Sequence, residues 1–326
     1  MADSERSVEI LVVGAGMAGL AAASELQRAG HAVLVADEGR DVGGRLASRQ
    51  IGLATFDYGA QFMTARDPRF AAAVEQWAAA GVAEEWYRSS PGGHPRWRGK
   101  PTMTAVAHHL ARPLDLLLAR RVIRIRRHAV GWLVELESGE TILAGAVLLT
   151  APTPQALALL DAGQVGLTSA LRARLERIAY ECCLAVMATL AGPTRLPPPG
   201  WLAPAEGPVA WIADNQLKGV SAAPAVTIHA TAAFSLQHWD HDRQMSGQKL
   251  LEAARPWLGS DVVEFQVHGW RYSKPCQSEQ DLCLVLNRQP PLLIAGDACG
   301  GPRVEGAALS GWAAADLLKQ MAIPSS

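Results

Sequence analysis

The chain has 326 residues, of which 49% are hydrophobic and 19% are charged, and its formal net charge is −1. This composition is typical of a globular protein and excludes a disordered chain. A net charge so close to zero provides no general attraction to nucleic acid or to an anionic membrane, so we expect neither as a partner.

The N-terminal residues and the cysteines indicate a cytoplasmic protein. The first seven residues lack the basic-then-apolar order of a secretory signal. The most apolar later stretch, residues 178–192, carries a glutamate and is too short to span a bilayer. The cysteines are odd in number and contain no CxxC pair, which favours reduced thiols over disulfides or a metal site: Cys182, Cys183, Cys276, Cys283 and Cys299.

The first predicted elements are a strand, a helix and a second strand. Residues 9–13 are a short apolar run, and the alanine-rich residues 17–29 are typical of a helix that ends at Gly30. Residues 31–36 are rich in β-formers. This order is the βαβ unit of a doubly wound sheet.

Later segments continue the α/β pattern. Strands are expected at residues 121–127, 131–137, 141–150, 178–191, 225–234, 262–272 and 292–295. Helices are expected after Pro154 through Leu160 and at residues 168–177, 246–258 and 304–321. A nucleotide-binding pattern at both ends of the chain, with mixed β structure between them, predicts two interleaved domains.

The segment Gly14-Ala15-Gly16-Met17-Ala18-Gly19 is a dinucleotide-binding fingerprint, because it follows a predicted strand and opens a predicted helix. The first glycine permits the tight turn, the second lets a pyrophosphate approach the backbone, and the third lets the helix pack closely on the strand. Asp37 or Glu38, about 20 residues further on, is placed to accept hydrogen bonds from ribose hydroxyls. The sequence leaves open which of the two does so.

Two further motifs favour FAD over NAD. Asp41-Val42-Gly43-Gly44-Arg45 follows the second strand, where a glycine pair admits a ligand and an arginine can pair with its phosphates. Ile294-Ala295-Gly296-Asp297 ends a late strand, and Arg303-Val304-Glu305-Gly306-Ala307 opens the last helix. An acid for polyol hydroxyls and a helix N-terminus would suit the ribityl chain and the electron-rich edge of a flavin.

With these motifs the sequence resembles the flavin amine oxidase superfamily and, within it, the renalase-like branch. The glycine motifs are common to the superfamily. The resemblance to the branch is carried by residues 56–62, 64–70, 97–103, 211–215, 229–231, 234–235, 270–272 and 296–311, and it covers nearly the whole chain. Asp214 and Gly269 stand where that branch usually carries basic residues, and Met63 where it carries an aromatic or aliphatic one.

The resemblance implies an α/β fold in which a Rossmann-like FAD-binding domain is interleaved with a mixed β-sheet substrate domain, as in p-hydroxybenzoate hydroxylase. We expect the FAD-binding domain at residues 1–60, 98–155 and 285–326, and the substrate domain at residues 61–97 and 156–284. Some relatives attach flavin to a C-terminal cysteine, but Cys299 lies two residues beyond Asp297. We therefore expect non-covalent FAD.

The residues expected to bind the cofactor come from these motifs and from the resemblance, which implies a backbone contact between Val122 and adenine and places Pro152 near the cofactor. They are Gly14, Gly16, Met17, Ala18, Gly19, Asp37, Glu38, Gly43, Gly44, Arg45, Gly59, Ala60, Gln61, Val122, Thr150, Pro152, Gly296, Asp297, Arg303, Val304, Glu305, Gly306 and Ala307.

The resemblance also implies the reaction. Renalase-like enzymes oxidise the 2- and 6-dihydro isomers of NAD(P)H to NAD(P)+ by hydride transfer to flavin N5, and O2 is then reduced to H2O2. Such a substrate is an activated hydride donor, so positioning supplies much of the acceleration and no strong base is required. Candidate pocket residues, each of which could instead be structural, are Gln61, Trp211, Asn215, His238, Trp270, Arg271 and Tyr272.

Three other functions stay open. An oxidase or dehydrogenase of a small amine would need an aromatic cage, which ten tryptophans could build. A non-redox FAD-binding protein has no positive support in the sequence. A plain NAD-dependent dehydrogenase is disfavoured, because it needs neither Gly43-Gly44-Arg45 nor Gly296-Asp297.

Overall fold

The computed structural model describes residues 5–90 and 92–324. The chain divides into two compact units, each assembled from separated segments. Unit 1 comprises Met1–Gly44, Ala107–Ala179 and Pro275–Ser326, and unit 2 comprises Arg45–Val106 and Tyr180–Lys274. In the described part of the chain, none of the helices is long and apolar enough to cross a membrane.

Unit 1 is built on an eight-stranded sheet whose central strands are parallel. Strand β1 (Glu5–Val13) pairs in parallel with β2 (Val33–Ala36) on one side and with β11 (Thr141–Leu149) on the other. The sheet continues in parallel to β8 (Asp115–Leu117) beyond β2 and to β18 (Pro291–Ala295) beyond β11. Antiparallel partners complete it: β17 (Cys283–Arg288) on β18, and the hairpin of β9 (Val122–His128) and β10 (Gly131–Leu136) on β11.

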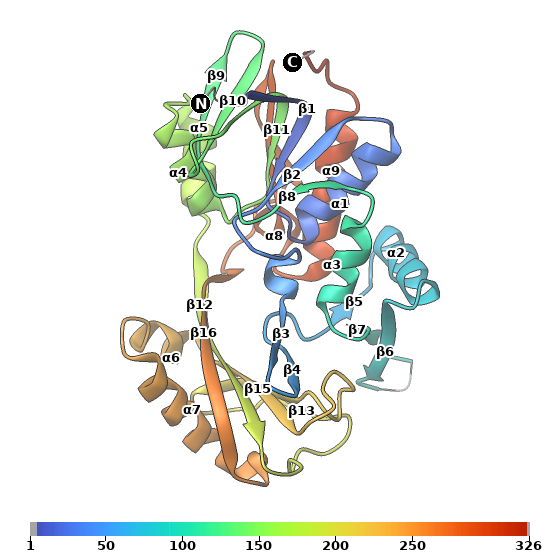
Figure 1. The fold of residues 1–326 in the computed structure, drawn as a ribbon, viewed down its shortest axis with the longest axis vertical. Helices are drawn as coiled ribbons and strands as arrows, with labels where there is room; N and C mark the ends of the chain where they lie inside the picture. The colour runs from blue at the N-terminus through green and yellow to red at the C-terminus, as the bar shows by residue number, and fades with distance from the viewer. Residues whose placement is uncertain (1–4, 91, 325–326) are drawn as a thin grey trace. The chain divides into compact units, whose positions relative to one another are not determined.

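Helices α1 (Met17–Arg28) and α9 (Val304–Leu318) lie side by side against this sheet (Figure 1). They approach closely because Gly311 has no side chain: a Cβ there would lie 2.1 Å from the carbonyl oxygen of Ala18. Helix α4 (Thr153–Ala162) packs on β9 and on α5 (Ser169–Glu176). The short α8 (Asp297–Gly300) links β18 to α9, and α3 (Thr104–Ala111) spans the boundary between the units in sequence.

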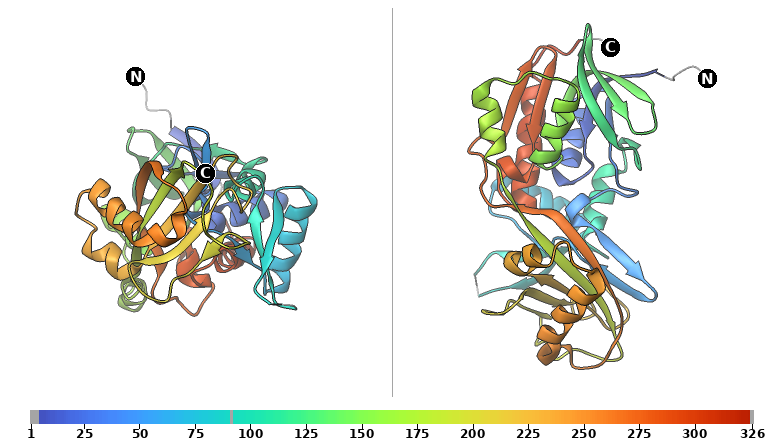
Figure 2. Two further views of the ribbon diagram at one scale, coloured as in Figure 1. Left: turned by 90° about the horizontal axis from the view of Figure 1, so that it is seen from below. Right: turned by 90° about the vertical axis from the view of Figure 1, so that its left-hand side faces the viewer.

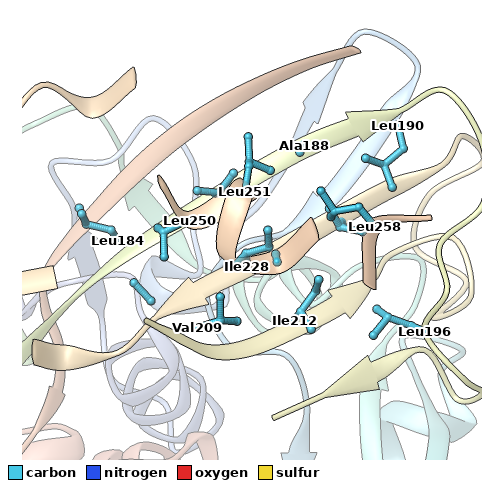
Figure 3. Close-up of a cluster of buried hydrophobic side chains, with 14 residues drawn as sticks. Leu184, Ala188, Leu190, Leu196, Val209, Ile212, Ile228, Leu250, Leu251 and Leu258 are labelled. Atoms are coloured by element: carbon cyan, nitrogen blue, oxygen red, sulfur yellow. The ribbon is translucent and has the colours of Figure 1, made fainter. Parts of the chain in front are cut away.

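Unit 2 is built on a five-stranded sheet with the order β13 (Trp201–Leu202), β14 (Val209–Asp214), β15 (Ala225–Ala230), β12 (Tyr180–Leu190) and β16 (Val262–Pro275). Helices α6 (Ala232–Gln237) and α7 (Arg243–Leu258) cover one face of this sheet, as Figure 2 shows. Apolar side chains fill the space between, among them Ile212, Ile228 and Leu250 (Figure 3). We call this the helix-covered face.

The opposite face of the sheet, which we call the hairpin face, packs against the hairpin of β3 (Ser48–Ile51) and β4 (Ala54–Asp57). Phe56 and Met187 are fully buried in this second core. A small antiparallel sheet of β5 (Met63–Thr64), β7 (Pro95–Gly99) and β6 (Ala83–Arg88) follows, together with α2 (Pro68–Ala79). Successive side chains of a strand point to opposite sides of a sheet, so neighbouring residues of the five-stranded sheet reach the helix-covered face and the hairpin face in turn.

The units divide the chain at different places from those expected. Residues 45–60 and 98–106 belong to unit 2, because Asp57 and its neighbours are hydrogen-bonded to side chains of that unit. Residues 156–179 and 275–284 belong to unit 1, where Arg174 pairs with Glu279 and the Cys276 amide donates to the Ala179 carbonyl. The expected strand at residues 225–234 ends at Ala230, because the Thr231 side chain caps α6.

Candidate flavin and substrate sites

The predicted fingerprint forms the turn between β1 and α1. Gly14 has φ +113°, and a Cβ there would lie 2.5 Å from Thr150 Oγ1. Gly19 packs so tightly that a Cβ would lie 1.9 Å from the Gly14 carbonyl oxygen. Gly16 differs, because a Cβ there would meet no described atom within 4 Å. The turn is thus closed around Gly14 and Gly19 and open at Gly16, as a bound pyrophosphate requires.

The N-terminus of α1 is suited to an anion. Within the described residues, no side chain caps this end and no acidic residue occupies its first turn. The N–H groups and the positive end of the helix dipole therefore remain available to a phosphate. Gly43 lies beside this turn, because its amide donates to the Ala15 carbonyl at 2.8 Å.

The structure distinguishes the two acids at the end of β2. Asp37 accepts from the Ala15 amide at 2.5 Å and from the Gly39 amide at 2.6 Å, so its carboxylate lies at the glycine turn. Glu38 instead lies 3.5 Å from Arg121, and both side chains are 58% exposed. The geometry favours Asp37 as the ribose ligand.

Three further predicted cofactor residues also belong to unit 1. The Thr150 hydroxyl donates to the carbonyls of Val13 and Gly14, so this side chain supports the glycine turn from behind. Pro152 is the residue that precedes α4, and Val122 begins β9 with its side chain buried. The Thr150 hydroxyl is therefore engaged within the protein.

The C-terminal motif forms a second turn at the carboxyl end of β18, a strand of the same parallel sheet as β1. Gly296 has φ +141°, and its amide donates to Ser310 Oγ at 2.7 Å. Asp297 and Glu305 are both buried, at 7% and 9% exposure. The motif residues Arg303, Val304, Gly306 and Ala307 form the start of α9. Ligands of parallel sheets bind outside the carboxyl ends of the strands, which is where both motifs lie.

Arg45 belongs to unit 2 and holds two of its segments. Its guanidinium donates to the carbonyls of Tyr272 and Ser273 at 3.3 and 3.2 Å. Its own carbonyl accepts from the Ala60 amide at 2.8 Å, and Gly59 packs so close that a Cβ would lie 2.1 Å from that oxygen. Arg45 thereby fixes the backbone at Gly59 and Ala60.

Side chains of the hairpin face form hydrogen bonds with the backbone carbonyls of the segment from Asp57 to Gln61. The Tyr58 carbonyl accepts from the Trp270 indole and lies 3.0 Å from His229 Nε2. The Asp57 carbonyl accepts from Thr227 Oγ1 at 2.9 Å and from Gln61 Nε2 at 2.6 Å. The hydrogen bond to the Asp57 carbonyl therefore orients the Gln61 side chain.

A buried ion pair lies at the centre of this network. Lys218 Nζ lies 2.7 Å from the Asp57 carboxylate, and both side chains are 0% exposed. The same ammonium is 3.5 Å from Gln61 Oε1 and 5.1 Å from the centre of the Trp86 ring. Burial lowers the pKa of Lys218, while the attraction of Asp57 opposes that shift.

The seven candidate pocket residues fall on both faces of the five-stranded sheet. Trp211 lies opposite His229 in the strand register, and Trp270 stacks on Tyr58, so both tryptophans are on the hairpin face with Gln61. The strand alternation sends Arg271 to the helix-covered face, where it lies over Trp239. One pocket on the hairpin face cannot include Arg271.

Three candidates contact other side chains of unit 2. Asn215 is 0% exposed, and its amide contacts the Asp57 amide and Thr227 Oγ1, which favours a structural role. His238 ends α6, and its Nδ1 lies 2.8 Å from His241 Nδ1. Tyr272 packs edge-on against Tyr180.

Aromatic rings gather on the hairpin face around Trp211. It stacks on Trp201 with ring centres 4.4 Å apart and planes 6° apart. Phe62 contacts Trp211, Tyr87 contacts Trp201, and the Arg96 guanidinium lies 5.3 Å from the Phe62 ring centre. The face therefore offers flat apolar surface beside a cation.

Sequence reasoning missed Asp57, Lys218, Tyr58 and His229 as parts of the site. Asp57 and Tyr58 stand within the segment 56–62 that carried the family resemblance, but a buried aspartate has no local sequence signal. Its partner Lys218 is 161 residues away. The register of β14 and β15 places His229 opposite Trp211, and Lys218 lies in the segment between these two strands.

Both histidines on the hairpin face are held neutral. Burial lowers the pKa of His229 to about 4. The charge of Lys218 adds to this shift, and the hydrogen bond to the Tyr58 carbonyl opposes it. Burial and the charges of Arg49 and Arg243 lower the pKa of His268 to about 4 as well. Neither imidazole carries a charge at neutral pH.

This neutrality predicts loss of stability in mild acid. Unfolded histidines bind protons near pH 6.5, whereas these two resist protonation until about pH 4, so the unfolded state gains protons first. The free energy of unfolding is expected to fall as the pH drops through this window. Urea unfolding at pH 7, 5.5 and 4.5 measures it. His229→Gln should reduce the slope, and an unchanged slope in both His229→Gln and His268→Gln would contradict the assignment.

Two protein-family models match the chain. The model of the NAD(P)-binding Rossmann-like domain matches residues 12–77. The model of flavin containing amine oxidoreductases matches residues 71–319, which is more than half of the chain.

A 58-residue segment is 53% identical to AofH of Mycobacterium tuberculosis, whose name describes a flavin-containing monoamine oxidase. The same match occurs in a second strain of that organism. The segment is 18% of this chain and spans only 13% of the length of those relatives.

Solved structures share the fold over almost the whole chain. A triple mutant of putrescine oxidase superposes with a TM-score of 0.75 at 15% identity, over 97% of this chain and 100% of that one. Wild-type putrescine oxidase with putrescine bound gives 0.73 at 14% identity, over 96% and 99%. A protein from Exiguobacterium sp. 255-15 described as a protoporphyrinogen oxidase gives 0.71 at 12% identity, over 98% and 100%. These likenesses confirm the predicted α/β fold class with its Rossmann-like part.

Proposed function

Because the chain belongs to the family of flavin-containing amine oxidoreductases, with FAD as its cofactor, we propose that it oxidises the 2- and 6-dihydro isomers of NAD(P)H to NAD(P)+. The observation that carries the proposal is that the described residues of the hairpin face that we have placed offer neither an unpaired carboxylate nor a strong base. Asp57 is paired with Lys218, and His229 and His268 are neutral above about pH 4.

This face suits a substrate that needs no proton removed. A dihydropyridine gives up a hydride directly and becomes an aromatic pyridinium, so orientation is the main requirement. FAD, when bound, would supply the hydride acceptor at N5 and pass both electrons to O2. The balanced reaction is NAD(P)H isomer + H+ + O2 → NAD(P)+ + H2O2.

We assign the residues of the chain to binding and orientation. In unit 1, the open backbone at Gly16 and the N-terminus of α1 hold the pyrophosphate, and Asp37 holds the adenosine ribose. In unit 2, the oriented Gln61 and the rings of Trp211 and Trp270 provide flat surface and hydrogen bonds for a nicotinamide. The network around Asp57 keeps Gln61 in place.

The cofactor is proposed to be held without a covalent bond. Burial raises the pKa of the Cys299 thiol to about 12, so the sulfur is protonated at neutral pH. A thiolate is the nucleophilic form of cysteine, and a protonated buried thiol attacks poorly. Cys299 is therefore a packing residue in this account.

Oxidation of a small amine is the second candidate, favoured by the match to AofH and by the aromatic rings around Trp211. An alkylamine is protonated at neutral pH, since such groups have pKa values of about 10, and it must lose that proton before it can donate a hydride. The hairpin-face residues that we have placed offer this cation no unpaired carboxylate, since Asp57 is paired with Lys218, and their histidines are too weakly basic to deprotonate it readily.

Anaerobic stopped-flow absorbance separates these functions. The holoprotein is mixed with borohydride-generated dihydronicotinamide isomers, or with a panel of amines that includes putrescine, and flavin absorbance near 450 nm is followed. We expect rapid bleaching by the isomers at a rate that is flat between pH 6 and 9. Bleaching by amines alone, with a rate that rises with pH, would reject the proposal in favour of amine oxidation. No bleaching by any compound would favour a non-redox FAD protein.

A further inference from the structure

We propose that Trp239, Arg243 and Arg271 form a binding site for a phosphate group on the helix-covered face of unit 2. The site involves none of the residues assigned above to FAD or to the dihydronicotinamide, and it does not depend on the proposed reaction. It accounts for Arg271, which the strand alternation separates from Trp211 and Trp270.

A glycine in β16 makes room for this cluster. Gly269 stands in the middle of the strand and faces α7. A Cβ there would lie 3.0 Å from the Trp239 ring and 3.1 Å from Arg243 Nη2. Any other residue would displace the indole or the guanidinium, so the missing side chain creates the place that Trp239 and Arg243 occupy.

Two guanidinium groups share one indole ring. The Arg243 guanidinium carbon lies 4.7 Å from the centre of the Trp239 ring, and that of Arg271 lies 5.3 Å from the same point. The face of an aromatic ring attracts a guanidinium cation, but this contact does not use the N–H groups in the plane of the guanidinium. Those N–H groups remain available for an acceptor.

No carboxylate of the described residues pairs with either arginine. The nearby Glu181 is bound to Lys274 at 3.0 Å, and Asp242 accepts from the Met245 amide as the cap of α7. Arg243 Nη1 is buried and has no hydrogen-bond partner among the described residues. A buried charged donor without an acceptor is destabilising, so an anion beside this guanidinium would stabilise the arrangement.

The number and shape of the donors favour phosphate. Two guanidinium groups present forked N–H pairs, which match the oxygens of a phosphate and can bind it bidentately. A phosphate dianion balances both positive charges, whereas a carboxylate balances one. The phosphate can be free or part of a nucleotide, and Arg271 is exposed enough to admit either.

Isothermal titration calorimetry of the holoprotein in a chloride buffer of constant ionic strength tests the site. The probes are inorganic phosphate, pyrophosphate, ADP and, as the phosphate-free control, adenosine. We expect saturable phosphate binding in the unaltered chain that weakens at least tenfold in Arg271→Gln and in Arg243→Gln. Preference for ADP over inorganic phosphate, lost in the same variants, would identify a nucleotide as the source; equal affinity would identify free phosphate.

Arg255→Gln is the matched control, because Arg255 lies on the same helix, is 77% exposed and pairs with Glu252. It removes one positive charge without touching the cluster, and we expect unchanged affinity. Equal weakening in Arg255→Gln would mean general charge attraction and would overturn the proposal, as would the absence of saturable heat with every phosphate probe. Arg271 is at the surface, so Arg271→Gln keeps the test valid if Arg243→Gln fails to fold.

Discussion

Gly16→Val is expected to give folded protein that carries no flavin. A Cβ at Gly16 meets no described atom within 4 Å, and the backbone there has φ −78°, which valine adopts freely. The branched side chain would fill the space that the pyrophosphate needs at the N-terminus of α1. Absorbance at 450 nm should be lost while the circular dichroism spectrum and elution volume stay those of the unaltered protein.

Two further glycines make this result specific. Gly166→Val also enters open space, at an exposed position of unit 1, so it should retain flavin. Gly19→Val would drive a side chain into the Gly14 carbonyl, 1.9 Å from its Cβ, so it should not fold. A yellow Gly16→Val protein with stoichiometric FAD would place the pyrophosphate elsewhere.

Lys218→Met is expected to lower the free energy of unfolding by about 3–5 kcal/mol, the usual cost of removing one partner from a buried ion pair. The methionine fills a similar volume, but the fully buried Asp57 is left without its counter-charge. Urea unfolding of the holoprotein, followed by tryptophan fluorescence, measures the loss. Flavin reduction should slow as well, because Asp57 and Lys218 both contact Gln61.

The double variant Asp57→Asn/Lys218→Met provides the internal check. It removes both charges, so it should be more stable than the sum of the single changes predicts. Lys274→Met serves as the surface control, since Lys274 pairs with Glu181 at 55% and 34% exposure and should contribute less than about 1 kcal/mol. Strict additivity of the two buried changes would show that the pair has no coupling.

Local patterns predicted unit 1 well. The fingerprint, the helix 17–29 and the strands around it correspond to β1, α1 and β2, because hydrophobic period and glycine turns are local signals. The last strand and helix were also predicted, as β18 and α9. Helix α7 begins at Arg243, three residues before the expected start, because Asp242 caps it.

Unit 2 was harder to predict from the sequence. The hairpin β3–β4, the sheet β5–β7–β6 and helix α2 lie in a segment that offered motifs but no clear period. Their contacts join residues far apart in the chain, such as Thr55 and Ser221, which are 166 positions apart. Long-range pairing of this kind leaves no local pattern.

The residues of the candidate pocket were also only partly predictable from local sequence patterns. Trp270, Arg271 and Tyr272 are adjacent in the sequence, which predicts that they belong to one pocket. A strand sends alternate side chains to opposite faces, which places Trp270 with Gln61 and Arg271 with Trp239. The sequence shows that alternation, but only the structure shows that the two faces are covered by different elements.

The central claim is that this chain holds one FAD without a covalent bond, and acid precipitation of the purified protein tests it most directly. We expect a yellow protein whose flavin passes entirely into the supernatant and is identified there as FAD, at one molecule per chain. A colourless protein that binds no added FAD, or a yellow pellet with flavin retained at Cys299, would contradict it.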